Sequence, residues 1–244
     1  MLSEVVVVPS TQHPMAPSTD ETTVLTLPST SESADSSQGL SGIILDGQWR
    51  LDTLRPKDLN AVAAICKESF PLDYPQSWYE DVVTGRFIAY GVFYGQTLTS
   101  LLVAEIKKIA DCDNEDKGLD SDPESLVVYI LSLAVSSAYR RRGIATVLLD
   151  YLLKTYVNNA FPKLVFLHVL STNYGAISFY KRSGFKHYST IPNYYYIDNT
   201  YQSGSTFVLY TARSVSPYSV SAMFNYVLAY VCRPFRALFR SKFC

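Results

Sequence analysis

Residues 129–146 constrain the fold of this chain more than any other stretch. They begin with the apolar run Tyr129–Val135, which is typical of a buried strand, and continue through a short turn into the basic sequence RRRG at positions 140–143. An apolar pattern with helical spacing starts directly after it. A helix that begins on such a loop presents unpaired backbone N–H groups and the positive end of its dipole. The sequence therefore predicts an anion site, most often one for phosphate, between a strand and a helix.

The spacing of Arg140, Gly143 and Ala145 resembles the phosphate loop of the GNAT acetyltransferase superfamily. Small residues there let the backbone approach a pyrophosphate, and arginines neutralise its charge. The loop is not of the Walker type, because no Gly-Lys-Ser/Thr follows, and it lacks the three glycines of a Rossmann fingerprint. Taken alone, a basic loop before a helix also fits a plain solvated helix start.

The remaining patterns predict an α+β fold, in which helices flank one mixed and mostly antiparallel sheet. The segments with the features of strands are residues 49–54, 87–94, 98–106, 129–135, 164–170, 185–192 and 206–210. The segments with the features of helices begin near residues 55, 77, 143 and 173. Gly95-Gln96 has the composition of a hairpin turn between two of the strands.

Composition divides the chain into three parts. Residues 1–47 are rich in Ser, Thr and Pro, with acids but no Lys or Arg before residue 47, and are predicted to be a disordered tail. No basic segment precedes the short valine run near Met1, so a secretory signal is not expected. The folded domain is predicted over residues 48–212, and a basic tail over residues 213–244.

The tail 213–244 has apolar residues at steps of three and four from Val220 onward, beside several arginines. It lacks an uninterrupted apolar span of about 20 residues, so a transmembrane helix is disfavoured. Amphipathic segments on an anionic membrane surface fit better, and docking on the domain itself or on a second copy, as a homodimer, is the alternative. Cys232 and Cys244 are candidates for palmitoylation.

The formal net charge of −1 argues against general nucleic-acid binding. The cysteines show neither a Cys-x-x-Cys pair nor a disulfide-like spacing, so we expect reduced thiols and no zinc. The acidic insert, residues 111–124, lacks the spacing of a calcium-binding EF-hand. We expect it to be a solvated, mobile loop, and we expect no metal.

Several motifs in order extend the resemblance to the protein N-terminal acetyltransferases of the GNAT superfamily, and among them to the Golgi-associated type. They are FPLDYP at 70–75, YILSL at 129–133, LHVLSTN at 167–173, AISFY at 176–180 and PNYYY at 192–196. The resemblance covers roughly residues 49–210. It implies the GNAT fold with splayed central strands, acetyl-CoA as co-substrate, and a protein N-terminus as the partner.

The resemblance also implies the residues of the site. Tyr129 and His168 would accept the proton of the attacking amine through ordered water, although on its own each would be interpreted as a core residue. The residues implied for acetyl-CoA binding are Leu133, Ala134 and Val135 through their backbone, and Arg141, Arg142, Gly143, Ile144, Ala145, Thr146, Asn173 and Tyr180. The residues implied for the peptide are Phe70, Leu72, Asp73 and Tyr74 on one wall and Leu131, Tyr194 and Tyr195 on the other. Asp73 replaces a glutamate of the family, which shortens the acidic arm.

The expected activity is acetylation of N-termini that keep methionine before Lys, Leu, Ile, Phe or Gln, on the cytosolic face of Golgi membranes. The resemblance also implies acetylation of histone lysines, which we rank second because a lysine amine has a higher pKa than an N-terminus and is harder to deprotonate. Two alternatives stay open: an acetyltransferase for a small amine, and a membrane-docked module that binds CoA without catalysis.

Overall fold

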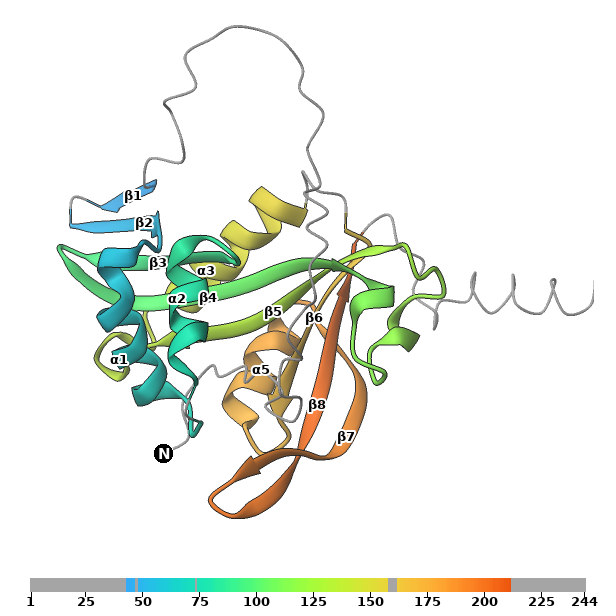
Figure 1. Ribbon diagram of the computed structural model, residues 1–244. Helices are drawn as coiled ribbons and strands as arrows, with labels where there is room; N and C mark the ends of the chain where they lie inside the picture. Colours follow the sequence, from blue (N-terminus) through green and yellow to red (C-terminus); the bar gives the residue numbers. More distant parts are fainter. Residues whose placement is uncertain (1–42, 47, 73, 158–161, 212–244) are drawn as a thin grey trace, which may run out of the picture.

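The structure, a computed structural model, describes residues 43–46, 48–72, 74–157 and 162–211 (Figure 1). These residues form one 8-stranded sheet with the strand order β1-β2-β3-β4-β5-β6-β8-β7. Strands β5 and β6 are parallel, and the other neighbouring strands are antiparallel. The predicted α+β class with a mixed, mostly antiparallel sheet is confirmed.

The strands from β1 to β6 follow the order of the chain, and the parallel pair β5 and β6 is joined through α3. A second helical connection, through α5, takes the chain from β6 to β7, and β8 then returns between them. Their bounds are Ile43–Asp46 for β1, Trp49–Thr53 for β2, Ile88–Tyr94 for β3, Thr97–Lys108 for β4, Leu126–Val135 for β5, Leu164–Leu170 for β6, Lys186–Ile197 for β7 and Thr200–Tyr210 for β8. The α-helices are α1, Leu59–Ser69; α2, Gln76–Thr84; α3, Ile144–Leu152; and α5, Tyr174–Arg182. A π-helical turn, Leu153–Val157, continues α3.

Each face of the sheet carries its own hydrophobic core. Val62 of α1 and Val82 of α2 pack into the cluster that contains Tyr129. Helices α3 and α5 pack on the opposite face, where Leu148 belongs to the cluster that contains Ile130. Because neighbouring strand residues point to opposite faces, Tyr129 and Ile130 serve different cores. The site chemistry of β5 therefore lies on the face covered by α1 and α2 (Figure 1).

Several predicted boundaries were wrong by a few residues. Strand β5 starts at Leu126 rather than at residue 129, and β8 starts at Thr200 rather than at residue 206. Strand β7 was predicted to end near Pro192, but it continues to Ile197 across a register shift. A proline is tolerated there because β7 is an edge strand with irregular pairing at that point. In addition, β1 lies within the segment predicted to be a tail.

The prediction of a solvated, mobile loop for the acidic insert was wrong. The 3₁₀ turn Ile109–Asp111 leads into the insert, which contains a second one, Lys117–Leu119. It also buries side chains between its exposed acids, among them Cys112, Leu119 and Asp116, which is only 2% exposed. A carboxylate is buried in this way only when it is paired or hydrogen-bonded. The insert therefore belongs to the folded domain.

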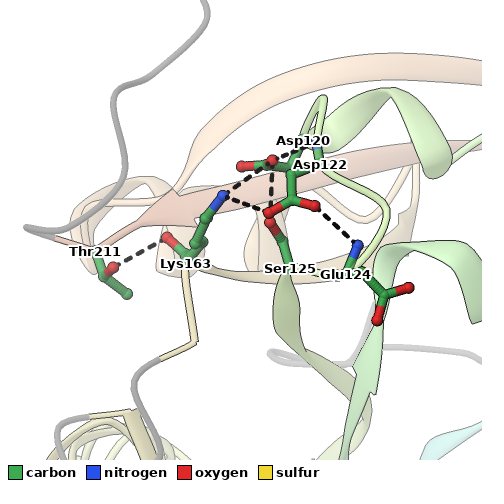
Figure 2. A network of polar contacts seen from close by, with 6 residues as sticks. All are labelled: Asp120, Asp122, Glu124, Ser125, Lys163 and Thr211. Atoms are coloured by element: carbon green, nitrogen blue, oxygen red, sulfur yellow. Dashed lines mark hydrogen bonds and ion pairs between the residues drawn. The ribbon is translucent and has the colours of Figure 1, made fainter.

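Polar contacts fix the far end of the insert to the start of β6 (Figure 2). The Lys163 ammonium lies 3.4 Å from a carboxylate oxygen of Asp120 and 3.4 Å from one of Asp122. The Ser125 hydroxyl donates to Asp120 at 3.1 Å, and the Thr211 hydroxyl donates to the carbonyl of Lys163 at 3.0 Å. Ion pairs this exposed stabilise little individually, but together they define where the insert ends.

Within the described residues, no helix is long and apolar enough to cross a membrane. Several predictions lie outside the described residues: the tail over residues 1–42, the membrane-binding tail 213–244, and the role of Asp73. These stay predictions.

Candidate functional site

Strands β5 and β6 separate halfway along their length. Their pairing runs from Val127 with Leu164 to Ile130 with Leu167. Beyond that point β5 stays paired with β4 as far as Val135, and β6 stays paired with β8. A bulge at Leu131, where the register between β4 and β5 shifts, lies where the strands part. Backbone groups on the facing edges are thus left for an extended ligand, as the predicted splayed strands require.

The loop between β5 and α3 has the backbone geometry of an anion site. Gly143 is the N-cap of α3 with φ +77°, a left-handed conformation in which glycine is favoured. Arg141 is also left-handed, with φ 64°, which an arginine adopts only when its surroundings hold it there. The free N–H groups of the α3 N-terminus open from this loop. Both residues keep the loop in a conformation that suits a phosphate.

A cavity of about 280 Å³ lies against this loop. The predicted acetyl-CoA residues among its lining are Val135, Arg141, Gly143, Ile144, Ala145 and Thr146. The cavity is also lined by Arg140 and Arg182, so three guanidinium groups surround it. Arg140 donates through Nε to the carbonyl of Val135 at 2.9 Å, which ties the loop back to the end of β5. The site is strongly positive, as a pyrophosphate requires.

The other residues predicted for acetyl-CoA do not line this cavity. Arg142 points elsewhere, with its guanidinium carbon 5.6 Å from the centre of the Tyr139 ring. Leu133 and Ala134 are buried in β5, where only their backbone could contribute. Asn173 caps α5, because its side chain accepts a hydrogen bond from the Ala176 N–H at 3.1 Å.

Tyr180 carries a buried hydroxyl that has no hydrogen-bond partner among the described residues. The side chain is 0% exposed, and burial raises the pKa of the phenol well above its ordinary value. Leaving such a hydroxyl unpaired costs about 1–3 kcal/mol. A ligand atom with a lone pair would remove that cost, which fits the place of Tyr180 among the residues implied for acetyl-CoA binding. The residues present thus fit acetyl-CoA in both charge and hydrogen bonding.

His168 is the centre of a buried hydrogen-bonded cluster on the α1/α2 face. Its Nδ1 lies 3.1 Å from the hydroxyl of Tyr129 and 2.9 Å from that of Tyr194. Its Nε2 lies 3.0 Å from Oδ1 of Asp116. Because a carboxylate only accepts, Nε2 of the neutral ring carries the hydrogen and Nδ1 is left as the acceptor for a phenol. We name Asp116, His168, Tyr129 and Tyr194 the proton chain.

Tyr129 stays protonated at neutral pH. Burial raises the pKa of its phenol well above the ordinary value, and the neighbouring Tyr194, Tyr195 and Asp116 raise it further. The phenol therefore cannot act as a standing base. It can take a proton only while it donates its own to His168, whose Nδ1 lies within hydrogen-bonding distance of it. The structure thus brings the predicted pair of Tyr129 and His168 into direct contact.

The residues predicted for the peptide meet in the same hydrophobic cluster as Tyr129. The members among them are Phe70, Tyr74, Leu131, Tyr194 and Tyr195, with Leu72 packed against them. Tyr194 has a second role that its sequence motif did not indicate, because its hydroxyl faces His168. Gly204 of β8 makes room for it, since a Cβ there would lie 2.7 Å from the Tyr194 ring.

Sequence reasoning missed two further residues. Asp116 lies in the acidic insert, and nothing in the sequence of that insert indicates that one of its acidic side chains is buried. Glu68, at the end of α1, accepts from the backbone N–H of Ser137 at 2.7 Å. Burial acts to raise the pKa of Glu68, but hydrogen bonds from Ser137 and Ser136 and the charge of Arg140 outweigh it and lower the pKa. Glu68 thus ties α1 to the loop that precedes the phosphate site.

No group of three or more His, Cys, Asp or Glu side chains in the described part of the chain is arranged to hold a metal ion.

Comparison with known proteins agrees with this geometry. The acetyltransferase (GNAT) family matches residues 67–185. N-alpha-acetyltransferase 60 of Drosophila melanogaster is 37% identical over 198 residues, which cover 70% of this chain and 72% of the relative. Histone acetyltransferase MCC1 of Arabidopsis thaliana is 27% identical over 81% of this chain and 84% of the relative.

Solved structures show the same similarity. Arabidopsis thaliana NAA60 in complex with a bisubstrate analogue has a TM-score of 0.63 and 26% identity, over 68% of this chain and 99% of that chain. The same protein in complex with acetyl-CoA has a TM-score of 0.61 and 26% identity, over 66% of this chain and 98% of that chain. Both the fold and the kind of ligand expected at the cavity have a counterpart in a solved relative.

Proposed function

The chain belongs to the GNAT acetyltransferase family as an N-alpha-acetyltransferase, and we propose that it acetylates protein N-termini that begin with methionine followed by Lys, Leu, Ile, Phe or Gln. Acetyl-CoA is the co-substrate, in keeping with the acetyl-CoA complex of Arabidopsis thaliana NAA60. The proposed substrates include the cytosolic N-termini of membrane proteins. Family membership favours catalysis over a module that only binds CoA.

The observation that carries the proposal is the proton chain beside the parting strands. An α-amino group has a pKa near 8, so removing its proton at neutral pH requires only a modest base. The Tyr129 oxygen can take that proton as its own hydrogen passes to Nδ1 of His168. Asp116 then faces an imidazolium and stabilises its charge. The chain of groups can therefore deprotonate an amine without a phenol that is ionised beforehand.

The phosphate loop and Tyr180 supply the other half of the reaction. Arg140, Arg141 and the N-terminus of α3 would hold the pyrophosphate of acetyl-CoA, which supplies the acetyl group as a thioester. Burial raises the pKa of Tyr180, so its hydroxyl keeps the proton and would stabilise the departing sulfur by donating a hydrogen bond to it. Both partners would thus meet where β5 and β6 separate.

An apolar first side chain is supported by the walls of the peptide region. Phe70 and Tyr74 pack edge to face at 5.7 Å, and Tyr194 and Tyr195 at 4.8 Å. Rings of this kind enclose an apolar side chain such as methionine, and their hydroxyls can bond the first peptide groups.

Acetyl transfer to a library of N-terminal peptides tests the proposal. The purified full chain should acetylate Met-Lys and Met-Leu peptides and release CoA in equal amount. Peptides beginning with Ser or Ala, and spermidine as a small amine, should be acetylated at least about tenfold more slowly. Faster transfer to spermidine would replace the proposal with the small-amine alternative. Histone peptides with a blocked N-terminus test lysine acetylation, which we propose as a slower second activity.

We also propose that the basic tail places the enzyme on the cytosolic face of Golgi membranes as a peripheral protein. The alternation of apolar residues with Arg233, Arg236 and Arg240 supports this location. A chain ending at Arg213 should lose Golgi localisation and binding to anionic vesicles while it keeps its activity on peptides. Retention on Golgi membranes would contradict the proposal. If the tail instead holds a homodimer together, the truncated chain should have the solution mass of a monomer and the full chain that of a dimer.

A further inference from the structure

The ammonium of Lys107 lies over the ring of Tyr129, with Nζ 4.7 Å from the ring centroid. Both side chains belong to paired strands, and Tyr129 of β5 lies opposite Glu105 of β4. Glu105 and Lys107 are two residues apart and share one face of the strand. The carboxylate of Glu105 lies 2.7 Å from Nζ. Glu105 therefore fixes the position of the charge over the phenol.

The other neighbour of the Tyr129 ring is Phe166 of β6. The two rings are stacked, with centroids 4.7 Å apart and an interplanar angle of 13°. Because β5 lies between β4 and β6, Phe166 and Lys107 contact the phenol from opposite flanking strands. The position of the Tyr129 hydroxyl thus depends on both contacts.

Lys107 carries its charge in a partly buried position, where the ion pair with Glu105 offsets the cost of desolvation. Its side chain is only 20% exposed, so the ammonium has lost much of its hydration. Burial acts to lower the pKa of Lys107, but the charge and hydrogen bond of Glu105 outweigh it and raise the pKa. The group is therefore a cation at neutral pH, next to an aromatic face that attracts it.

The proton chain explains what the cation does. Nδ1 of His168 has a single lone pair, yet the hydroxyls of Tyr129 and Tyr194 both lie within hydrogen-bonding distance of it, at 3.1 and 2.9 Å. The two phenols compete, and Tyr194 is the nearer. A small tilt of the Tyr129 ring would lengthen the longer contact and leave Nδ1 to Tyr194 alone.

We propose that Lys107 is a positioning residue that keeps the hydroxyl of Tyr129 directed at His168. The inference rests on the proposed N-terminal acetyltransferase function. In the transfer, one hydrogen passes from the amine to the Tyr129 oxygen and another from that oxygen to Nδ1. Any lag between the two leaves negative charge on the phenol, and the ammonium over the ring stabilises it.

Substitutions of Lys107 in the full chain test this role. Lys107→Met keeps the aliphatic stem and removes the charge, and kcat on a Met-Leu peptide should fall about three- to tenfold. The KM for acetyl-CoA should stay within about twofold, because the cavity is elsewhere. Lys107→Arg keeps a cation that can lie over the ring and should recover most of kcat.

Lys108→Met is the matched control. Lys108 is the next residue and pairs with Glu124 at 2.7 Å, but its side chain is 42% exposed and it lies away from the Tyr129 ring. Its kcat should stay within about twofold of the parent. If Lys107→Met matches the parent, or Lys107→Arg is as slow as Lys107→Met, the positioning role is wrong.

Histidine NMR separates this inference from the proposed function. The chain has only 3 histidines, so the ¹⁵N signals of His168 can be assigned by substitution. Lys107→Met should shift the Nδ1 signal of His168 from its position in the parent. In Lys108→Met, the same signal should stay at the parent position. A parent enzyme that acetylates no peptide would refute the proposed function, while the NMR shift would still support Lys107. An unchanged Nδ1 signal in Lys107→Met would refute the inference itself.

Discussion

Asp116 accepts a hydrogen bond from Nε2 of His168 at 3.0 Å, although 52 residues separate the two in the sequence. Both side chains are almost fully buried, at 2% and 1% exposed. The contact selects one tautomer of the ring and turns the Nδ1 lone pair toward the phenols of Tyr129 and Tyr194. The acidic insert therefore contributes a buried carboxylate to the candidate site on the central strands.

Asp116→Ala should reduce kcat by at least about tenfold, because His168 loses the group that fixes its tautomer and stabilises its charge. Asp116→Asn keeps an acceptor at the same position and should lose less. The KM for acetyl-CoA should change little in either variant. Steady-state kinetics with a Met-Leu peptide measures these effects, and thermal unfolding shows whether each variant is folded at the assay temperature.

Glu115→Gln is the control for Asp116, since it removes a negative charge from an exposed neighbouring residue of the same insert. Its kcat should equal that of the parent. Equal losses in Glu115→Gln and Asp116→Asn would mean that the net charge of the insert matters and that the contact with His168 does not.

The sequence was sufficient to predict the strand, loop and helix around residues 129–146, because one apolar run and one basic loop carry the whole signal. It was not sufficient for the insert. Buried Asp116 and exposed Asp113 belong to the same acidic run, and only the long-range contact with His168 distinguishes them. The extent of β7 could not be predicted from the sequence either. Pro192 suggests that the strand ends there, but the edge position of β7 lets it continue to Ile197.

Tyr129→Phe should lower kcat by about a hundredfold. It removes the hydroxyl but keeps the ring on Phe166, so the effect reports the lost proton transfer and not a lost contact. Tyr194→Phe should lower kcat less, because Tyr129 can then use Nδ1 without competition. The double variant should be no slower than Tyr129→Phe by more than a few-fold, since groups that act in one chain are not additive.

The order of these effects is what the kinetics must establish. If Tyr194→Phe is the slower variant, Tyr194 passes the proton and Tyr129 only orients the ring. Gly204→Ala gives an independent check, because the added Cβ would displace the Tyr194 ring and should reproduce the Tyr194→Phe phenotype if Tyr194 acts through its position.

Ionisation of the Cys66 thiol should lower the free energy of unfolding at alkaline pH. Burial raises the pKa of its thiol from 9.0 to about 12 in the folded chain. The folded state therefore holds the thiol proton more tightly than the unfolded state. The contribution of the protonated thiol to the free energy of unfolding is complete below about pH 9 and is lost as the pH rises toward 12. Unfolding measured between pH 8 and 11 should show the decline, and Cys66→Ala should make it shallower. The same slope in both proteins would contradict this assignment, and alkylation of native Cys66 at pH 8 would contradict its burial.

Under the proposed function, Arg141 binds acetyl-CoA through its charge, while its backbone conformation adds strain, and two substitutions separate these effects. Its φ of 64° lies in the left-handed region, which costs a residue with a Cβ roughly 1 kcal/mol. Arg141→Gly removes both the strain and the guanidinium, whereas Arg141→Ala removes only the guanidinium. Both variants should raise the KM for acetyl-CoA about tenfold, because each loses a charged hydrogen-bond donor at the cavity.

The two variants should differ in stability and not in KM. Arg141→Gly should unfold at a higher temperature than Arg141→Ala, by an amount that corresponds to about 1 kcal/mol. Arg142→Ala serves as the control for charge, since Arg142 lies over Tyr139 and does not line the cavity, and its KM should rise less than that of either variant. An equal rise for Arg142→Ala would show that the loop acts through its total charge. In that case the left-handed backbone at Arg141 would have no part in positioning the guanidinium.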